Sequence, residues 1–100
     1  MPLSAIAINC TLKAEGASST DAMIEVLGDA FKEYDVKVGE TIRIASFDVK
    51  PGVTSDEGGG DDWPAIRTKI LAADILIFGT PIWMGQPCSI AKRVMERMDA

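Results

Sequence analysis

The chain has 100 residues, a net charge of −5 and 25% charged residues, which is typical of one small acidic globular domain. This acidic balance argues against partners such as nucleic acid or an anionic membrane, and no apolar run approaches the roughly 20 residues that span a bilayer. Histidine is absent, which excludes histidine-dependent triads and histidine metal sites. Cys10 and Cys88 form no CxxC pair, and the N-terminus lacks a signal-peptide pattern, so we expect reduced thiols and a cytoplasmic location.

The first third of the chain predicts a strand, a polar loop and a helix. Residues 3–9 are small and apolar and predict a short central strand. Ser18 or Ser19 is a natural N-cap for the helix, and Ser18 with Asp21 resembles a capping box. Apolar side chains then recur at helical spacing and predict an amphipathic helix with an apolar face made of Met23, Val26, Leu27, Ala30, Phe31 and Tyr34.

The middle of the chain predicts a strand, a long loop and a second helix. Residues 41–47 alternate in part and predict a strand nearer the sheet edge, with Gly39 in the turn before it. Residues 48–62 lose all periodicity and predict a long, mobile, acidic loop, which lacks the ligand spacing of a calcium loop. Pro64 marks the first turn of the second helix, whose buried face we expect to include Ile66, Ile70 and Leu71.

An apolar segment near the C-terminus organises the remaining chain. Residues 75–78 are an unbroken apolar run, which predicts a strand covered on both faces. Glycines and prolines between residues 79 and 87 then hold Ile82, Trp83 and Met84 in a loop, where ligands bind at the carboxyl ends of parallel strands. An equally good interpretation is that these residues cap the edge of the core. A third helix follows, with an apolar face made of Ile90, Ala91, Val94, Met95 and Met98.

The order of these elements is β-α-β-α-β-α, which predicts the α/β class. We expect a three-layer, flavodoxin-like, doubly wound parallel sheet with strand order 2-1-3. That order places the most apolar strand at an open edge with unpaired backbone groups. Its neighbour would come from further chain or from a second copy, and we expect a homo-oligomer.

The loop over residues 10–20 predicts an anion site. Ser18, Ser19 and Thr20 offer hydroxyl groups, Lys13 offers charge, and a helix N-terminus offers N–H groups. Simple helix capping competes with this interpretation, although one hydroxyl is enough for a cap. Three other phosphate loops fit poorly.

A Walker A loop requires Gly-Lys-Ser/Thr, which is absent here. A dinucleotide fingerprint requires three glycines, and this loop has only Gly16, although Asp48 stands near the place of a ribose-binding acid. A small phosphotyrosine phosphatase would have arginine where Gly16 stands. The remaining match is a flavodoxin-like loop, which uses hydroxyls and backbone N–H groups.

Three stretches resemble flavodoxin-like NAD(P)H-dependent oxidoreductases of the FMN reductase type: Asn9 to Lys13, Ser18 to Thr20, and Gly79 to Ser89. The resemblance covers residues 1–100 but only about the first half of a family domain, so we expect strands four and five to lie beyond it. Cys10 departs from the family, which often has glycine there.

The resemblance also implies a flavin site. It implies that the first loop binds the FMN phosphate through Thr11, Lys13, Ser18, Ser19 and Thr20. It implies that the loop after the third strand packs on the ribityl chain and isoalloxazine through Pro81, Ile82, Trp83, Met84 and Gly85.

The implied function is an enzyme that passes reducing equivalents from NAD(P)H through bound FMN to a small-molecule acceptor, such as a quinone, flavin, nitro or azo compound. No catalytic side chain is assigned, because the cofactor carries this chemistry. One alternative is a flavodoxin-type electron carrier, although carriers flank the flavin with two aromatic residues and only Trp83 is present here. The other alternative is a non-catalytic fragment.

Overall fold

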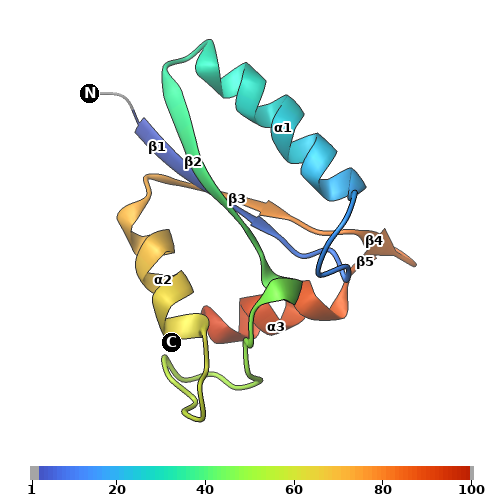
Figure 1. Ribbon diagram of the computed structural model, residues 1–100, viewed down its shortest axis with the longest axis vertical. Helices are drawn as coiled ribbons and strands as arrows, with labels where there is room; N and C mark the ends of the chain where they lie inside the picture. The colour runs from blue at the N-terminus through green and yellow to red at the C-terminus, as the bar shows by residue number, and fades with distance from the viewer. Residues whose placement is uncertain (1–2, 100) are drawn as a thin grey trace.

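The computed structural model describes residues 3–99, which form one parallel sheet with helices on both faces (Figure 1). Its strands β1 (Leu3–Asn9), β2 (Val36–Arg43) and β3 (Ile75–Gly79) pair in parallel in the order β2-β1-β3. The helices are α1 (Ser19–Lys32), α2 (Trp63–Ala72) and α3 (Ser89–Arg97). The predicted α/β flavodoxin-like sheet with order 2-1-3 is confirmed.

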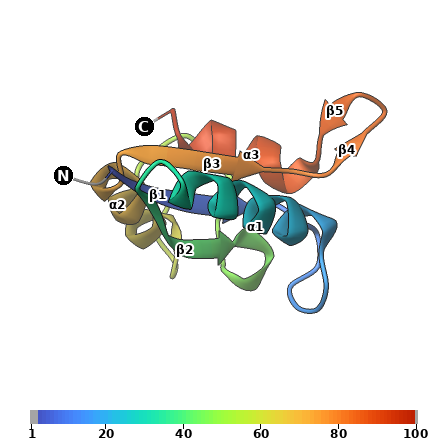
Figure 2. The ribbon, with the colours of Figure 1, turned by 90° about the horizontal axis from the view of Figure 1, so that it is seen from above.

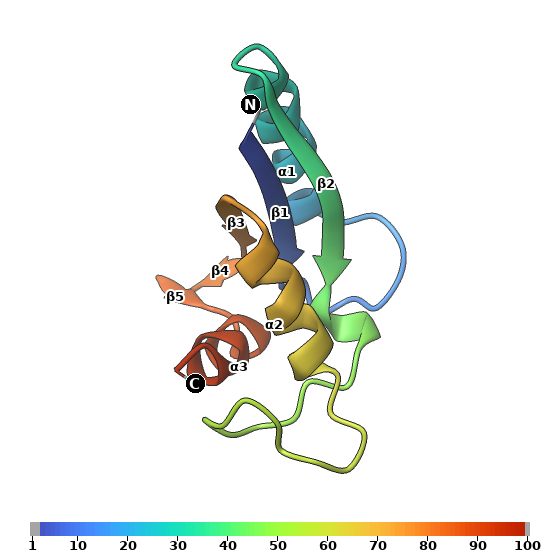
Figure 3. The ribbon, with the colours of Figure 1, turned by 90° about the vertical axis from the view of Figure 1, so that its left-hand side faces the viewer.

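Strand β1 is the centre of the fold, and its alternating side chains contribute to two cores. Ala5 and Ala7 pack with Ile24 of α1 on one face of the sheet. Ile6 and Ile8 pack with buried residues of α2 and α3 on the other face. The helices accordingly lie in two layers, α1 on one side and α2 with α3 on the other (Figure 3). This three-layer arrangement brings the loops that follow β1 and β3 to one end of the sheet.

Strand β2 corrects the sequence prediction, which placed the second strand over residues 41–47. The strand runs from Val36 to Arg43, and residues 44–46 form a short 3-10 helix. Gly39, which was predicted in a turn, lies inside the strand. The pairing with β1 shifts register there, since Ala5 pairs with Val38 but Ala7 pairs with Thr41. This bulge interrupts the strand alternation and hides the true start of β2 in the sequence.

Helix α1 presents a different face to the core than its sequence pattern predicted. Thr20 and Ile24 are its buried residues. Much of the predicted apolar face is exposed, namely Met23, Val26, Leu27 and Tyr34. The reason is that α1 lies beside β3, which pairs only with β1 within residues 3–99 and leaves that side of the helix uncovered. An apolar groove of 320 Å³ therefore runs between this face of α1 and residues 77–79 of β3.

Helices α2 and α3 also bury fewer apolar residues than predicted. Trp63 and Ile66 are buried in α2, whereas Leu71 is exposed. In α3 the buried residues are Ala91, Val94 and Arg97, while Met95 and the C-cap residue Met98 are partly exposed. The buried face of α3 therefore ends in a charged residue, Arg97. Strand β3, which lies between these helices and α1, is itself only partly buried, because it lies at the sheet edge and has no second neighbour within residues 3–99.

Arg97 holds the irregular segment over residues 48–62 against α3. Its guanidinium donates to the carbonyl oxygens of Lys50 at 2.8 Å and Thr54 at 3.1 Å, and to the Asp61 carboxylate at 2.6 Å. The guanidinium carbon also lies 5.8 Å from the centre of the Trp63 ring. The predicted irregular acidic loop is present, but it is tied to α3 by contacts that its composition does not reveal.

Candidate functional site

The candidate site lies at the end of the sheet where β1 and β3 finish. The loop after β1 and the segment after β3 both emerge there (Figure 2). The N–H of Cys10 donates to the carbonyl oxygen of Gly79 at 2.8 Å and joins the two strand ends. The Thr80 hydroxyl accepts from the N–H of Cys88 at 3.2 Å and closes the base of the second segment. These bonds place the two predicted groups of site residues at one edge of the sheet.

Ser18 is the N-cap of α1, as predicted. Its hydroxyl oxygen accepts from the N–H of Asp21 at 3.3 Å and from the side-chain amide of Asn9 at 3.5 Å. Both bonds use lone pairs of that oxygen, so its proton can still be donated to an anion. Ser19 is exposed at the first helical position, and the N–H groups of Ser19 and Thr20 have no acceptor within the helix. The start of α1 can therefore offer several donors to one anion.

The remaining predicted phosphate ligands occupy different surroundings. Thr11 is buried, and its N–H donates to Asn9 Oδ1 at 2.9 Å. Lys13 is exposed, and its ammonium group donates to the Ala17 carbonyl oxygen at 3.4 Å. Thr20 is buried against β3, where a Cβ on Gly79 would lie 2.7 Å from Thr20 Cγ2. The structure thus gathers Thr11, Lys13, Ser18 and Ser19 around one loop and packs the Thr20 methyl group against the sheet.

A polar network beneath this loop was missed by the sequence analysis. Asn9, at the end of β1, donates to the Asp21 carboxylate at 2.6 Å. Arg43, at the end of β2, pairs with the same carboxylate and donates to the Gly16 carbonyl oxygen at 2.9 Å. Burial opposes ionisation of Asp21, but the bonds from Arg43 and Asn9 outweigh it and hold its pKa below the usual value. The positions of Asn9 and Arg43 at neighbouring strand ends were the available signal, but the wrong bounds of strand two hid it.

The segment after β3 is a hairpin, where a loop was predicted. Strands β4 (Ile82–Trp83) and β5 (Gln86–Pro87) pair in an antiparallel way. Met84 and Gly85 form the turn and both have positive φ, as a two-residue hairpin turn requires. Ile82, Trp83 and Met84 are exposed, and Met84 is 99% exposed, so these three residues lie outside the core. Successive strand residues point to opposite faces, so Ile82 and Trp83 present apolar surface on two sides of the hairpin.

Residues 3–100 match the sequence model of the family described as NADPH-dependent FMN reductase. The chain belongs to the NADPH-dependent FMN reductase family. The chain is 41% identical over 103 residues to a Mycobacterium bovis protein named divalent metal cation transporter MntH, and the match covers 98% of this chain and 15% of that protein. The matched stretch is a small part of that transporter, so the transporter's name is no guide to this stretch.

Two further comparisons involve riboflavin phosphates. The chain is 26% identical over 109 residues to 8-demethyl-8-aminoriboflavin-5'-phosphate synthase of Streptomyces davaonensis, and the match covers 99% of this chain and 42% of that protein. Its fold matches the crystal structure of RosB with a bound 8-demethyl-8-formylriboflavin-5'-phosphate intermediate, with a TM-score of 0.78 and 24% identity over 97% of this chain and 42% of that one. The chain spans less than half the length of these relatives.

Both cysteines of the chain are buried free thiols. Cys88 caps α3, and its sulfur lies 3.0 Å from the carbonyl oxygen of Cys10, to which it donates. Burial, with a smaller contribution from Cys88, raises the pKa of the Cys10 thiol to about 12. Cys10 therefore stays protonated near neutral pH, and its position beneath the loop is a packing position.

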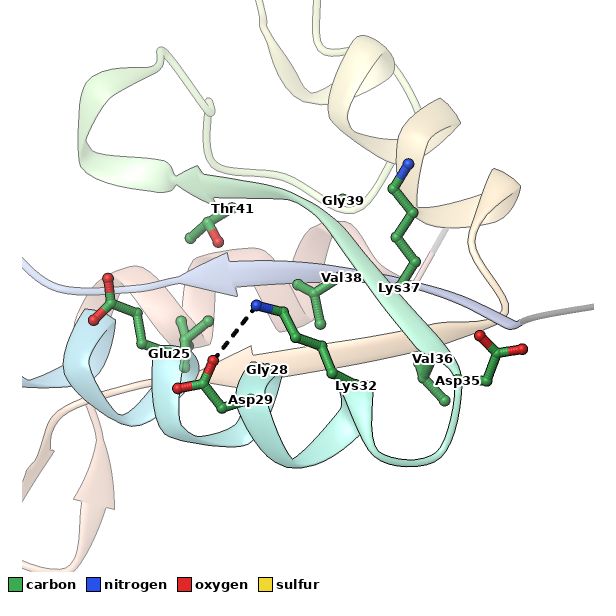
Figure 4. A pocket seen from close by; sticks show the side chains of 11 residues that line it. Glu25, Gly28, Asp29, Lys32, Asp35, Val36, Lys37, Val38, Gly39 and Thr41 are labelled. Carbon is green, nitrogen blue, oxygen red and sulfur yellow. Dashed lines mark ion pairs between the residues drawn. The ribbon is translucent and has the colours of Figure 1, made fainter.

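A separate hollow of the chain lies away from the candidate site. A cleft of 640 Å³ separates α1 from the outer edge of β2, and polar and charged side chains line much of it (Figure 4). Asp29 and Lys32 form an ion pair within it at 3.7 Å. None of the predicted site residues lines this cleft. Within residues 3–99, no cluster of acidic, cysteine or histidine side chains could hold a metal ion, and no helix is long and apolar enough to cross a membrane.

Proposed function

We propose that this chain forms the FMN-binding part of an NAD(P)H-dependent oxidoreductase. One observation carries the proposal. A loop rich in hydrogen-bond donors, at the start of α1, lies at the same end of the sheet as an exposed apolar hairpin. The donors suit a phosphate group, and the apolar hairpin suits an isoalloxazine ring. The names of two relatives, which both contain a riboflavin phosphate, support that class of ligand.

The phosphate would lie at the start of α1. The Ser18 hydroxyl keeps its proton for donation, and the N–H groups of Ser19 and Thr20 are unpaired within the helix. Lys13 is exposed beside the loop and can reach an anion by releasing the Ala17 carbonyl oxygen. Thr11 helps to shape the loop from a buried position. The donor set therefore fits a phosphate group without any metal ion.

The ring would lie against the hairpin. Pro81 leads into β4, and Gly85 allows the tight turn that exposes Ile82, Trp83 and Met84. Because Ile82 and Trp83 point to opposite faces, one of them lines the ring and the other faces away. We expect Trp83 to be the ring partner, since a flat aromatic surface stacks on a flat ligand. The apolar hairpin would then exclude water from one face of the flavin.

Bound FMN supplies hydride acceptance from NAD(P)H and electron delivery to a small acceptor such as a quinone, free flavin, nitro or azo compound. The chain's own contribution is to anchor the phosphate and to present one wall for the ring. That division of work needs no histidine and no catalytic side chain. Stopped-flow mixing of the FMN-loaded chain with NADPH should show rapid loss of flavin absorbance. A loaded chain that NADPH does not reduce would refute hydride transfer by this chain and would leave the flavodoxin-type carrier and the non-catalytic fragment as the alternatives.

The test of the phosphate site compares FMN with riboflavin, which lacks the phosphate. The variant Ser18→Ala/Ser19→Ala removes two hydroxyls and should lower FMN affinity by about tenfold or more per lost charged hydrogen bond. Riboflavin affinity should change little. Titration of the purified chain, followed by flavin fluorescence, measures both. Within residues 3–99 the proposed ring site has one wall, the hairpin, so we expect weak wild-type affinity, and the titration needs a high protein concentration.

The matched control is Thr68→Ala, which removes a hydroxyl from α2 that donates to the Pro64 carbonyl oxygen. It should leave both affinities unchanged. A melting curve is needed for each variant, because the loss of an N-cap costs about 0.5–2 kcal/mol of helix stability. Equal losses of FMN and riboflavin affinity in folded Ser18→Ala/Ser19→Ala would refute the phosphate assignment.

A further inference from the structure

Arg43 stands directly beneath the loop that follows β1. It is the last residue of β2, and only 17% of its side chain is exposed. Its guanidinium pairs with the Asp21 carboxylate and donates to the Gly16 carbonyl oxygen. One side chain therefore joins the end of β2, the middle of the loop and the first turn of α1.

Three carbonyl oxygens of this loop accept hydrogen bonds from side chains. The Ala14 oxygen accepts from the Ser46 hydroxyl at 2.7 Å, the Gly16 oxygen from Arg43 and the Ala17 oxygen from Lys13. Carbonyl oxygens carry partial negative charge and would repel an anion if they faced it. Arg43 and Ser46 bind two of these three oxygens, so the segment that begins at Arg43 keeps the Gly16 and Ala14 oxygens from facing an anion.

The Asp21 carboxylate would repel an anion at the start of α1. Its carboxylate lies in the first turn of α1, beside the N–H groups that a phosphate would use. The chain as a whole carries a net charge of −5, so its general field does not attract anions. Arg43 is the cation that pairs with Asp21. Without it, the first turn would present an uncompensated carboxylate to the incoming phosphate.

We propose that Arg43 is a positioning residue for the flavin phosphate. Arg43 neutralises the charge of Asp21 and holds the loop so that its N–H and hydroxyl donors can reach the phosphate. This inference rests on the proposed function and deepens it, since it states what makes a phosphate site workable in an acidic chain. Asn9 supports the same arrangement from β1, because its amide bridges the Asp21 carboxylate and the Thr11 N–H. Arg43 itself need not touch the ligand.

The experiment measures FMN and riboflavin affinities of four variants of the full chain. Arg43→Met removes the charge and both bonds, and should lower FMN affinity about tenfold or more with little effect on riboflavin. Arg43→Lys keeps the charge but lacks the planar guanidinium group, so its FMN affinity should lie between those of Arg43→Met and the wild type. Asp21→Asn keeps an acceptor oxygen and should bind FMN at least as well as the wild type. Arg43→Met/Asp21→Asn should recover most of the FMN affinity that Arg43→Met loses.

The control is Lys69→Met, which removes an equal charge from the exposed Lys69–Glu40 pair outside the loop. It should leave the FMN affinity unchanged. A purely structural role for Arg43 would lower FMN and riboflavin affinity alike, and the double variant would be no better than Arg43→Met. If Arg43→Met does not fold, a fall in FMN affinity in Asp21→Asn would overturn the inference, and an equal or higher affinity would support it.

The two proposals fail in different ways. If the wild-type chain binds neither FMN nor inorganic phosphate, the proposed function fails and this inference fails with it. If the wild type binds FMN and Arg43→Met binds it equally well, the phosphate site stands and the role of Arg43 is wrong.

Discussion

Trp83 is half exposed on a short hairpin, which is a costly place for an indole unless a ligand covers it. We predict that FMN quenches the tryptophan fluorescence of the chain and that Trp83→Ala removes most of this quenching. The physical reason is that a stacked isoalloxazine ring deactivates the neighbouring indole. Fluorescence titration with FMN measures the effect directly.

The control for that prediction is Trp63, which is 1% exposed and packs in the core beside Arg97. Trp63→Phe is the suitable substitution, since truncation of a buried tryptophan to alanine costs about 3–5 kcal/mol. Trp63→Phe should keep the FMN-dependent quenching. If it abolishes the quenching while Trp83→Ala leaves it intact, the hairpin is not the ring wall.

For single residues, the sequence predicted those roles that depend on neighbours along the chain. Ser18 was recognised as the cap of α1 because capping uses a local spacing of three residues. Arg43 was missed because its role depends on where β2 ends, and a bulge at Gly39 shifted the predicted strand toward the C-terminus. Thr20 was assigned to phosphate from its hydroxyl at the helix start and from the family resemblance, and its contact with Gly79 appears only once β3 is placed. The predicted flavin contacts themselves remain predictions.

Helix α3 and the segment over residues 48–62 act as one unit through Asp61 and Arg97. The bonds from Arg97, opposed by burial and aided by backbone N–H groups of Glu57, Lys50 and Trp63, hold the pKa of Asp61 far below its usual value. A carboxyl group with a lowered folded-state pKa stabilises the fold above its unfolded pKa, and the effect is lost as the pH falls. We predict that the free energy of unfolding decreases between about pH 5 and pH 2, and that this decrease is smaller in Asp61→Asn.

Urea denaturation at a series of pH values tests this, with Asp56→Asn as the control. Asp56 lies in the same segment but is exposed, and asparagine keeps the oxygen that accepts from the Gly58 N–H. Arg97→Met is the stronger perturbation, because it leaves the buried Asp61 carboxylate without its cation and should cost roughly 3–5 kcal/mol. A pH profile of Asp61→Asn that matches the wild type would contradict the coupling.

The spacing of apolar residues predicts where a helix lies, but it does not tell which face of the helix is buried. The spacing of apolar residues correctly located α1 and α3, because it follows from the helical repeat. It could not tell which part of each apolar stripe meets the core. Ile24, which the predicted stripe of α1 did not include, is buried, whereas Val26 of that stripe is exposed. Arg97 is buried in α3 because its partners come from a distant irregular segment, which no local pattern encodes.

The molecule as a whole exposes an apolar surface along one edge. It comprises the α1 residues Met23, Val26 and Leu27, the groove beside them, and the partly buried strand β3. A strand edge with unpaired backbone groups beside apolar side chains is a template for association. We predict that the purified chain self-associates with rising concentration and binds FMN more weakly than micromolar. Size-exclusion chromatography with light scattering and an FMN titration measures both properties.

A charge on this surface should reduce the association. Val26→Lys places an ammonium group on the exposed face of α1, and we expect a shift toward the monomer without loss of fold. Val53→Lys is the matched control, because Val53 is similarly exposed but lies in the segment over residues 48–62. A well-folded wild-type monomer with sub-micromolar FMN affinity would show that the open edge needs no partner.

The topology was predictable because few arrangements satisfy the observed order of elements. Alternating strands and helices require crossovers, and an apolar first strand takes the central place between its two neighbours. The order β2-β1-β3 followed from those constraints. What could not be derived was the extent to which β3 is covered. Its continuous apolar sequence predicts two covered faces, but its five residues are mostly half-buried in this chain.

The turn of the hairpin makes Met84 a chemical reporter. Met84 is 99% exposed, whereas Met23 is 69% exposed and Met95 and Met98 are less than half exposed. Thioether oxidation to the sulfoxide follows solvent access, so dilute peroxide should modify Met84 first. The sulfoxide is polar and would weaken an apolar ring contact at the hairpin. Peptide mass spectrometry after brief oxidation, with and without FMN, would therefore report occupancy of the hairpin through the protection of this one sulfur atom.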